Sequence, residues 1–192
     1  MSQAVASKGI SERVDWNRVA EDLDAEGNSV IKRMLSPGEC DGVRALYDHE
    51  DIFRSQVVME RHGFGRGEYR YFRYPLPELV AELRTSIYPH LAPIANRWNE
   101  AMGVDVRYPS KHAAYVDRCH QAGQDKPTPL LLKYGAGDYN CLHQDIYGEL
   151  VPASSDDFVV GAEQRLHRRR VCDDGTEAAY AVAADRCAVA ER

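Results

Sequence analysis

The amino-acid sequence changes character after Val151, and this change limits how much of the chain can build a packed domain. Residues 152–192 contain no Ile, Met or Trp and only one Leu, one Phe and one Tyr, whereas nine of these 41 residues are Ala and six are Arg. Large apolar side chains supply much of the free energy that offsets the entropy lost on folding. We therefore expect residues 152–192 to be an aberrant, disordered tail, or a poorly packed Ala-rich helix, without core strands.

The preceding residues, 16–151, have the apolar patterning of a folded domain, and residues 1–15 are polar and aperiodic, as in a disordered N-terminus. Helical spacing and capping residues predict helices over residues 16–26, 36–47, 77–103 and 110–122. Strand-like runs are found at residues 29–35, 56–60, 69–74, 129–134 and 139–146. Helices that come first and strands that follow predict an α+β fold.

Two of these segments are predicted in more detail. Apolar residues recur every fourth position within residues 77–103, which predicts a helix with one side on the core; they are Leu79, Leu83, Ile87 and Leu91. The runs at 56–60 and 69–74 flank the glycine-rich sequence HGFGRG, which predicts a β-hairpin.

The charge balance argues against a general binder of polyanions. Lys and Arg number 24 against 30 Asp and Glu, so the net charge of −6 gives no overall attraction for nucleic acid or anionic lipid. No apolar run approaches the roughly 20 residues that span a bilayer, and the five cysteines form no CxxC pair. We expect a cytoplasmic protein that binds neither nucleic acid nor a membrane.

The sharpest chemical signal is the pair His143 and Asp145, two residues apart on a strand-like run. Side chains at that spacing on a strand point to the same face, so an imidazole and a carboxylate can hold one divalent ion. Alone, the pair also fits a solvated His and Asp. An earlier pair, His49 and Asp51, lies at the end of a predicted helix and is interpreted as a polar helix end. On spacing alone, the alternative is a metal site at this pair with His112 as third ligand.

The residues around the second pair form a longer pattern, Tyr134-x-x-Gly137-x-Tyr139-x-x-x-His143-x-Asp145. This pattern resembles the iron(II)- and 2-oxoglutarate-dependent dioxygenases, in their prolyl-4-hydroxylase-like branch. Upstream, the sequence VIKRMLSPGEC is similar to the opening strand and helix of that domain, so the resemblance covers residues 28–151. It implies a double-stranded β-helix, that is, a jelly-roll or cupin-like architecture, with N-terminal helices.

Carried over to this chain, the resemblance implies that His143 and Asp145 are the first two iron ligands. It implies that Tyr134 hydrogen-bonds 2-oxoglutarate, although a tyrosine packed in the sheet is an equally good interpretation. The implied reaction couples oxidative decarboxylation of 2-oxoglutarate to hydroxylation of a C–H bond. The implied cofactors are Fe(2+) and the cosubstrate 2-oxoglutarate, with ascorbate as a further candidate, and the substrate is a small molecule or a peptidyl residue.

The family also uses a distal His and a 2-oxoglutarate-binding Arg, which this sequence does not identify. The one later histidine is His167, in the run RLHRRR with Arg168, Arg169 and Arg170, and such a run is normally a solvated basic cluster. Codons compatible with residues 152–192, read one nucleotide later, can spell a β-rich run and a Gly-Gly-led strand that resemble the family's continuation. We therefore expect a frameshifted dioxygenase, incomplete at the C-terminus and impaired in activity.

Two other interpretations stay open. The first is a non-catalytic interaction protein, in which residues 77–122 pack against a partner and the His143 pair is vestigial. The second is a jelly-roll metal protein of another reaction class, such as a cupin-type isomerase, although these usually supply several His ligands in a tighter cluster.

Overall fold

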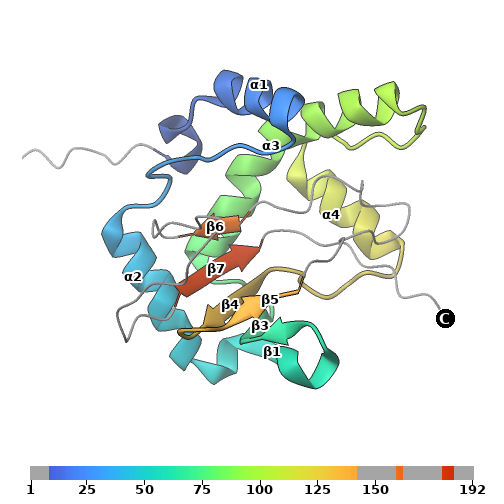
Figure 1. Ribbon diagram of the computed structural model, residues 1–192. Coiled ribbons are helices and arrows are strands. Elements are labelled where there is room, and N and C mark those ends of the chain that lie inside the picture. Colours follow the sequence, from blue (N-terminus) through green and yellow to red (C-terminus); the bar gives the residue numbers. More distant parts are fainter. Residues whose placement is uncertain (1–8, 142–158, 162–178, 184–192) are drawn as a thin grey trace, which may run out of the picture.

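A computed structural model describes residues 9–141, 159–161 and 179–183 (Figure 1). Its α-helices are α1 (Trp16–Glu26), α2 (Pro37–Ala45), α3 (Glu78–Ala101) and α4 (His112–Gln121). Short 3-10 helices are η1 (Ile10–Arg13), η2 (Leu46–Asp48), η3 (Glu50–Ile52) and η4 (Met59–His62). The strands are β1 (Phe53–Val58), β2 (Gly65–Arg66), β3 (Glu68–Phe72), β4 (Leu130–Tyr134), β5 (Tyr139–Asn140), β6 (Val159–Gly161) and β7 (Ala179–Ala183).

Helices α1 and α2 begin and end at the residues whose side chains can satisfy a helix terminus. The carboxylate of Asp15 accepts the backbone N–H of Arg18 at 3.1 Å, and Gly27 ends α1 with a left-handed φ of 70°. Ser36 and Glu39 form a capping box at the start of α2, each accepting the other's backbone N–H. The predicted starts of both helices are confirmed.

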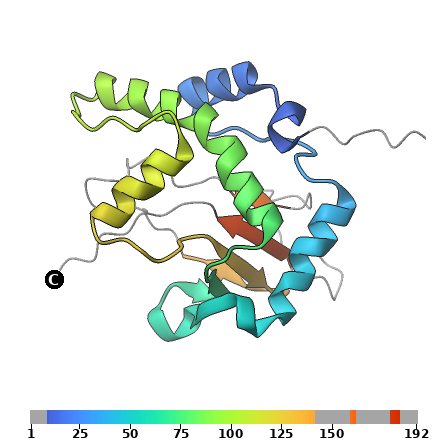
Figure 2. The same ribbon diagram turned by 180° about the vertical axis from the view of Figure 1, so that it is seen from behind.

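Helix α3 contributes to every apolar cluster found in the described part of the chain. Its first turns pack against α2 and the sheet, its middle against η1, and its last turns against α4. Figure 2 shows it crossing one face of the sheet. The predicted core stripe is confirmed, because Leu83 and Ile87 are 2% and 3% exposed. No helix among the described residues combines the length and the apolar character that a membrane span needs.

The main sheet has the strand order β1-β3-β4-β7-β6, and every neighbouring pair is antiparallel. The predicted hairpin is confirmed, since β1 pairs with β3 from Phe53 opposite Phe72 to Val58 opposite Glu68. Phe72 and Leu131 point to the helices and are fully buried. Strands β2 and β5 form a separate pair beside the hairpin.

The expected strand over residues 29–35 is wrong, because this segment forms a turn that packs on α3. Met34 is 4% exposed and lies in one cluster with Leu83 and Ile87, with Ile31 packed against it. Arg33 has a left-handed φ of 57°, which a regular strand does not contain. Apolar side chains anchor the segment here without the ladder of backbone hydrogen bonds that defines a strand.

Residues 159–161 and 179–183 are the strands β6 and β7, where we expected disorder or an Ala-rich helix. Strand β7 pairs with β4 along its whole length, from Leu130 opposite Ala183 to Tyr134 opposite Ala179, and β6 pairs with β7. A strand that already pairs on one side still offers unpaired N–H and C=O groups on the other. Backbone pairing on β4 therefore needs an extended segment rather than large apolar side chains.

The described residues thus form antiparallel sheets with helices packed on one face, in agreement with the mixed helix and strand content that we expected. The strands of this part of the chain do not close into a jelly roll. That architecture stays a prediction.

The carboxylate of Glu39 joins the N-terminal segment to α2. It accepts hydrogen bonds from the two terminal guanidinium nitrogens of Arg13, at 2.8 and 3.2 Å, and from the backbone N–H of Ser36 at 2.6 Å. The side chains of Arg13 and Glu39 are 22% and 26% exposed. Because these donors, with Arg13 first, favour the anion, the pKa of Glu39 falls from 4.5 to about 2.

Replacing Glu39 with Gln should therefore lower the free energy of unfolding by about 1–2 kcal/mol near pH 7, after allowance for solvent screening of the pair. The folded-state pKa lies below the unfolded one, so this stabilisation is complete above pH 4.5 and is lost as the pH falls towards 2. Urea denaturation at a series of pH values measures it. The control is Asp41→Asn, which removes an exposed partner of Arg44 on the same helix and should leave stability nearly unchanged. Equal stability of Glu39→Gln and the unchanged protein at pH 7 would contradict the prediction.

Candidate functional site

Alternation along β3 and β4 places the tyrosines of these strands on one side of the sheet. Antiparallel register sets Tyr69 opposite Leu132 and Tyr71 opposite Leu130, and residues that oppose each other share a face. Tyr134 lies two residues after Leu132 on the same strand and so points to this face as well. We call it the tyrosine face; its residues are Tyr69, Tyr71, Leu130, Leu132 and Tyr134.

Tyr134 is partly buried and packs directly against the backbone of the hairpin. A Cβ added at Gly67 would lie 2.8 Å from Cδ1 of Tyr134 and 3.1 Å from the carbonyl oxygen of Lys133. Gly67 also has a φ of 122°, a backbone angle that residues with a side chain rarely adopt. Burial, and then the nearby carboxylate of Asp138, raise the pKa of the Tyr134 phenol. A phenol is protonated at neutral pH and can donate a hydrogen bond.

The turn after β4 is closed by the side chain of Asp138. Its carboxylate accepts the backbone N–H of Gly135 at 2.8 Å, and its own N–H donates to the carbonyl of Gly135 at 3.1 Å. Gly137 has a φ of 82°, which a tight turn of this kind requires. The turn returns the chain so that β5 lies beside β2.

Strand β5 holds the chain against the hairpin just before the predicted metal ligands. A Cβ at Gly65, whose φ is 121°, would collide with the carbonyl oxygen of Tyr139. The backbone N–H of Cys141 donates to the carbonyl of Phe64 at 2.9 Å. The described segment ends at Cys141, two residues before His143 in the sequence.

The opposite face of the sheet uses its charged residues in packing. Arg70 lies 4.5 Å from the ring centroid of Tyr47 and donates to its carbonyl at 3.0 Å, and the Lys133 ammonium lies 4.8 Å from the same ring. Lys133 also lies 4.0 Å from the carboxylate of Glu68. Burial and the neighbouring Glu68 raise the pKa of Tyr47. Lys133 is next to Tyr134 in sequence but belongs to this other face.

The sequence interpretation missed the contacts of Arg54, Tyr69 and Tyr71 along the tyrosine face. The Arg54 guanidinium lies 4.3 Å from the ring centroid of Tyr71 and donates through Nε to the carbonyl of Pro127 at 3.2 Å. The rings of Tyr69 and Tyr71 meet edge to face at 5.6 Å. Their alternation in EYRYF was visible in the sequence, but the pairing with β4 was not.

The two predicted iron ligands, His143 and Asp145, lie outside the described residues, as does His167. Across residues 9–141 and the two tail strands, no three His, Cys, Asp or Glu side chains meet in a way that could hold a metal. His49 and Asp51 are both exposed, as a polar helix end requires. His112 instead packs on the ring of Tyr88, with centroids 5.3 Å apart.

Replacing Gly67 with Ala tests the contact that seats Tyr134. The added methyl group meets the ring and a strained backbone conformation together, so we expect a loss of about 2–3 kcal/mol in the free energy of unfolding. Gly63→Ala is the control, because Gly63 also has a positive φ, 71°, but nothing within 4 Å of the added Cβ. It should cost only about 1 kcal/mol. Urea unfolding measures both, and equal losses would show that the Tyr134 contact does not constrain position 67.

Comparison with known proteins relates part of this chain to a family of oxygenases. A family model described as an oxygenase catalysing oxidative methylation of damaged DNA matches residues 67–153, a stretch that contains Gly67, Tyr134 and both predicted iron ligands. Two uncharacterised proteins of Mycobacterium tuberculosis, from two strains, are each 44% identical over 80 residues. These residues are 42% of this chain and 34% of each relative, so the chain spans about a third of the relatives' length. No solved structure matches. The family match indicates an oxygenase-type family.

Proposed function

We propose that this chain is an iron(II)- and 2-oxoglutarate-dependent oxygenase of the prolyl-4-hydroxylase-like branch, with the described sheet as part of a double-stranded β-helix. The observation that carries the proposal is the oxygenase match over residues 67–153, because it contains the pattern from Tyr134 to Asp145. The match favours an enzyme over a non-catalytic interaction protein.

The donor chemistry of the pattern supports iron as the metal. An imidazole from His143 and a carboxylate from Asp145 suit a borderline divalent ion, and two His with one carboxylate is the ligand set of non-haem iron(II) oxygenases. Bound iron would let dioxygen act as the oxidant, with two electrons from decarboxylation of 2-oxoglutarate to succinate and two from the C–H bond that is hydroxylated; ascorbate is a candidate reductant. The part of the two ligands is to hold the ion and leave its other positions open. The third ligand is unidentified, so we expect weak iron binding.

The environment of Tyr134 supports a role in holding 2-oxoglutarate. The phenol is protonated at neutral pH, and a phenol O–H is a donor suited to a carboxylate. Gly67 fixes the ring from one side, and the ring shares its face with Tyr69 and Tyr71. A positioned donor of this kind orients a bound oxo-acid and does not itself take part in bond breaking.

Damaged DNA is the substrate class that we propose to test first, because it is the one that the family description names. The resemblance to the prolyl-4-hydroxylase-like branch favours a small molecule or a peptidyl residue instead. Both classes require the same iron and 2-oxoglutarate chemistry, so the two questions can be tested separately.

Iron binding is tested by comparing the two HxD pairs of the chain. Anaerobic calorimetric titration with ferrous iron should show binding that is lost in His143→Ala and Asp145→Ala and kept in His49→Ala. Release of succinate from 2-oxoglutarate should likewise be lost in His143→Ala and Asp145→Ala and kept in His49→Ala. Iron binding and succinate release that are unaffected by His143→Ala would overturn the proposal. Strong activity that His143→Ala abolishes would instead show that a third ligand exists and that the chain is not impaired.

Tyr134→Phe tests the proposed contact with 2-oxoglutarate. Loss of one hydrogen bond to a charged group should weaken 2-oxoglutarate binding by roughly tenfold, with iron binding unchanged. Tyr71→Phe is the control, since it removes a hydroxyl from the same face without touching the predicted pattern. The dissociation constant, measured by titration of the iron-loaded protein, distinguishes the two; equal effects would favour a packing role for Tyr134.

A further inference from the structure

The tip of the β1–β3 hairpin gathers aromatic rings and cations at the protein surface. Phe64 and Tyr139 are 48% and 54% exposed, and the imidazole of His62 stacks on Phe64 with centroids 5.4 Å apart. Arg61 and Arg66 are exposed beside them, and register sets Arg66 opposite Tyr139. We call Arg61, His62, Phe64, Arg66 and Tyr139 the tip cluster.

The hairpin carries a positive charge that the whole-chain balance conceals. Residues 53–73 contain five arginines and two glutamates, a formal charge of +3, in a chain of net charge −6. Glu68 is already engaged by Gln56 at 2.5 Å and by Lys133 at 4.0 Å. Glu60 faces Arg66 at 4.0 Å. The local field therefore favours an anionic partner, although the overall charge does not.

The tip is held in shape before any partner arrives. Met59 is 1% exposed and anchors it to the interior. The backbone of Met59 donates to the carbonyl of Gly67 at 3.0 Å and accepts from Phe64 at 3.1 Å. A surface that is already ordered loses little entropy when it binds.

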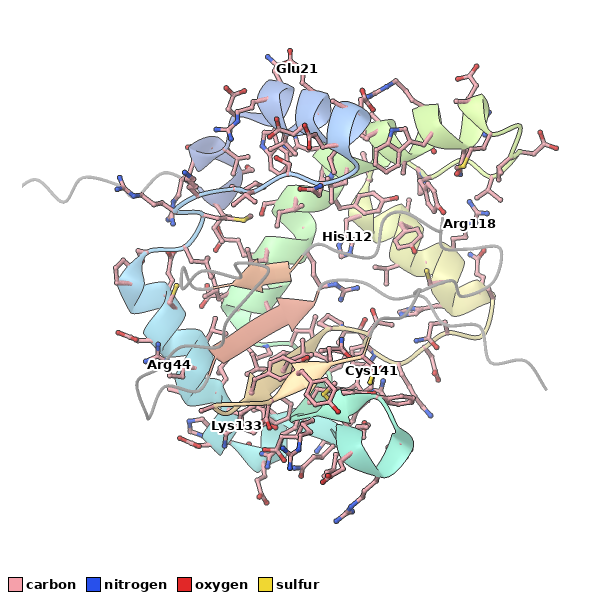
Figure 3. The ribbon with its side chains drawn as sticks, viewed as in Figure 1. Glu21, Arg44, His112, Arg118, Lys133 and Cys141 are labelled. Atoms are coloured by element: carbon pink, nitrogen blue, oxygen red, sulfur yellow. The ribbon has the colours of Figure 1, made fainter. Side chains whose placement is uncertain are left out.

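The tip cluster also lies next to the strand that leads into the predicted metal ligands. Phe64 accepts the N–H of Cys141, and Cys141 precedes His143 by two residues. Figure 3 shows Cys141 at the end of β5, beside the hairpin. A polymer held at the tip would therefore pass close to that segment of the chain.

We propose that the tip cluster binds a single-stranded segment of DNA, with bases stacked on Phe64 and Tyr139 and phosphates contacted by Arg61 and Arg66. Aromatic faces interleaved with cations are the usual platform for single strands, because every base has a face that can stack. A base inside a duplex is already stacked on its neighbours and is not available to the rings. The choice of DNA as the polyanion rests on the proposed function.

Fluorescence anisotropy of the full chain with a labelled single-stranded DNA of about 12 nucleotides tests the proposal. Phe64→Leu, which keeps an apolar side chain and removes the aromatic face, should weaken binding roughly five- to hundredfold. Phe64→Trp should retain it. An abasic oligomer of the same length, and a duplex, should bind as weakly to the unchanged protein as the intact strand binds to Phe64→Leu. Unchanged binding in Phe64→Leu, or equal binding of the abasic oligomer, overturns the proposal.

A matched pair of arginine variants tests how far the positive charge of the tip cluster contributes to DNA binding. Arg66 and Arg18 have side chains 58% and 62% exposed, and each lies near one carboxylate, Glu60 at 4.0 Å and Asp22 at 3.6 Å. Arg66→Ala should weaken binding and lower by about one the slope of the logarithm of the binding constant against the logarithm of the salt concentration. Arg18→Ala should do neither, because Arg18 belongs to α1, which lies at the opposite end of the molecule from the hairpin (Figure 1). Glu60→Gln should strengthen binding. Equal effects of the two arginine variants would show a non-specific charge effect and overturn the proposal.

The binding measurement separates this proposal from the proposed function. If the protein binds single-stranded DNA in a way that depends on Phe64 but binds no iron, the proposal for the tip cluster holds and the oxygenase proposal is overturned. If the protein binds iron and 2-oxoglutarate but no single-stranded DNA, the oxygenase proposal holds and the proposal for the tip cluster is overturned. Preferential binding of a peptide, or self-association through Phe64 and Tyr139, would also overturn the assignment of the tip cluster to DNA.

Discussion

Burial of one side of helix α3 is the constraint on which the arrangement of the other elements depends. Each apolar cluster of the described residues contains residues of this helix, so the N-terminal segment, the sheet and α4 are positioned through it. Packed interiors transmit small displacements instead of absorbing them. The sheet that carries Tyr134 is therefore placed by contacts on its far side, where Phe72 and Leu131 meet α2 and α3.

Local chemistry made much of this fold predictable from the sequence. Asp15, Ser36 and Gly27 set helix ends through hydrogen bonds and backbone conformations that involve only their own neighbours. The segment at 29–35 could not be predicted in this way, because its apolar residues suit a strand and an anchored turn equally well. Packing of Met34 against α3 decided between them. Strands β6 and β7 were missed because pairing with β4 depends on the backbone of a distant segment.

The candidate site was predictable only in part. Tyr134 was identified through the family resemblance, which rests on its spacing to Gly137, Tyr139 and the two predicted ligands, and the family match covers that pattern. The alignment of Tyr69 and Tyr71 with it depends on the register between β3 and β4, which are far apart in the sequence. The need for glycine at position 67 likewise depends on where the Tyr134 ring lies in space. The whole-chain charge, which argued against nucleic acid, averages over a hairpin of opposite sign.

The pairing of β7 with β4 also changes which strands stand at the margins of the sheet. Strand β4, with the sequence LLLKY, begins with three leucines, and it is enclosed by β3 and β7. The outer strands are β1, which carries Arg54, Ser55 and Gln56, and the three-residue β6. Short or polar margins make poor templates for adding another chain. A tail poor in large apolar residues can therefore protect a sheet from polymerisation through backbone pairing.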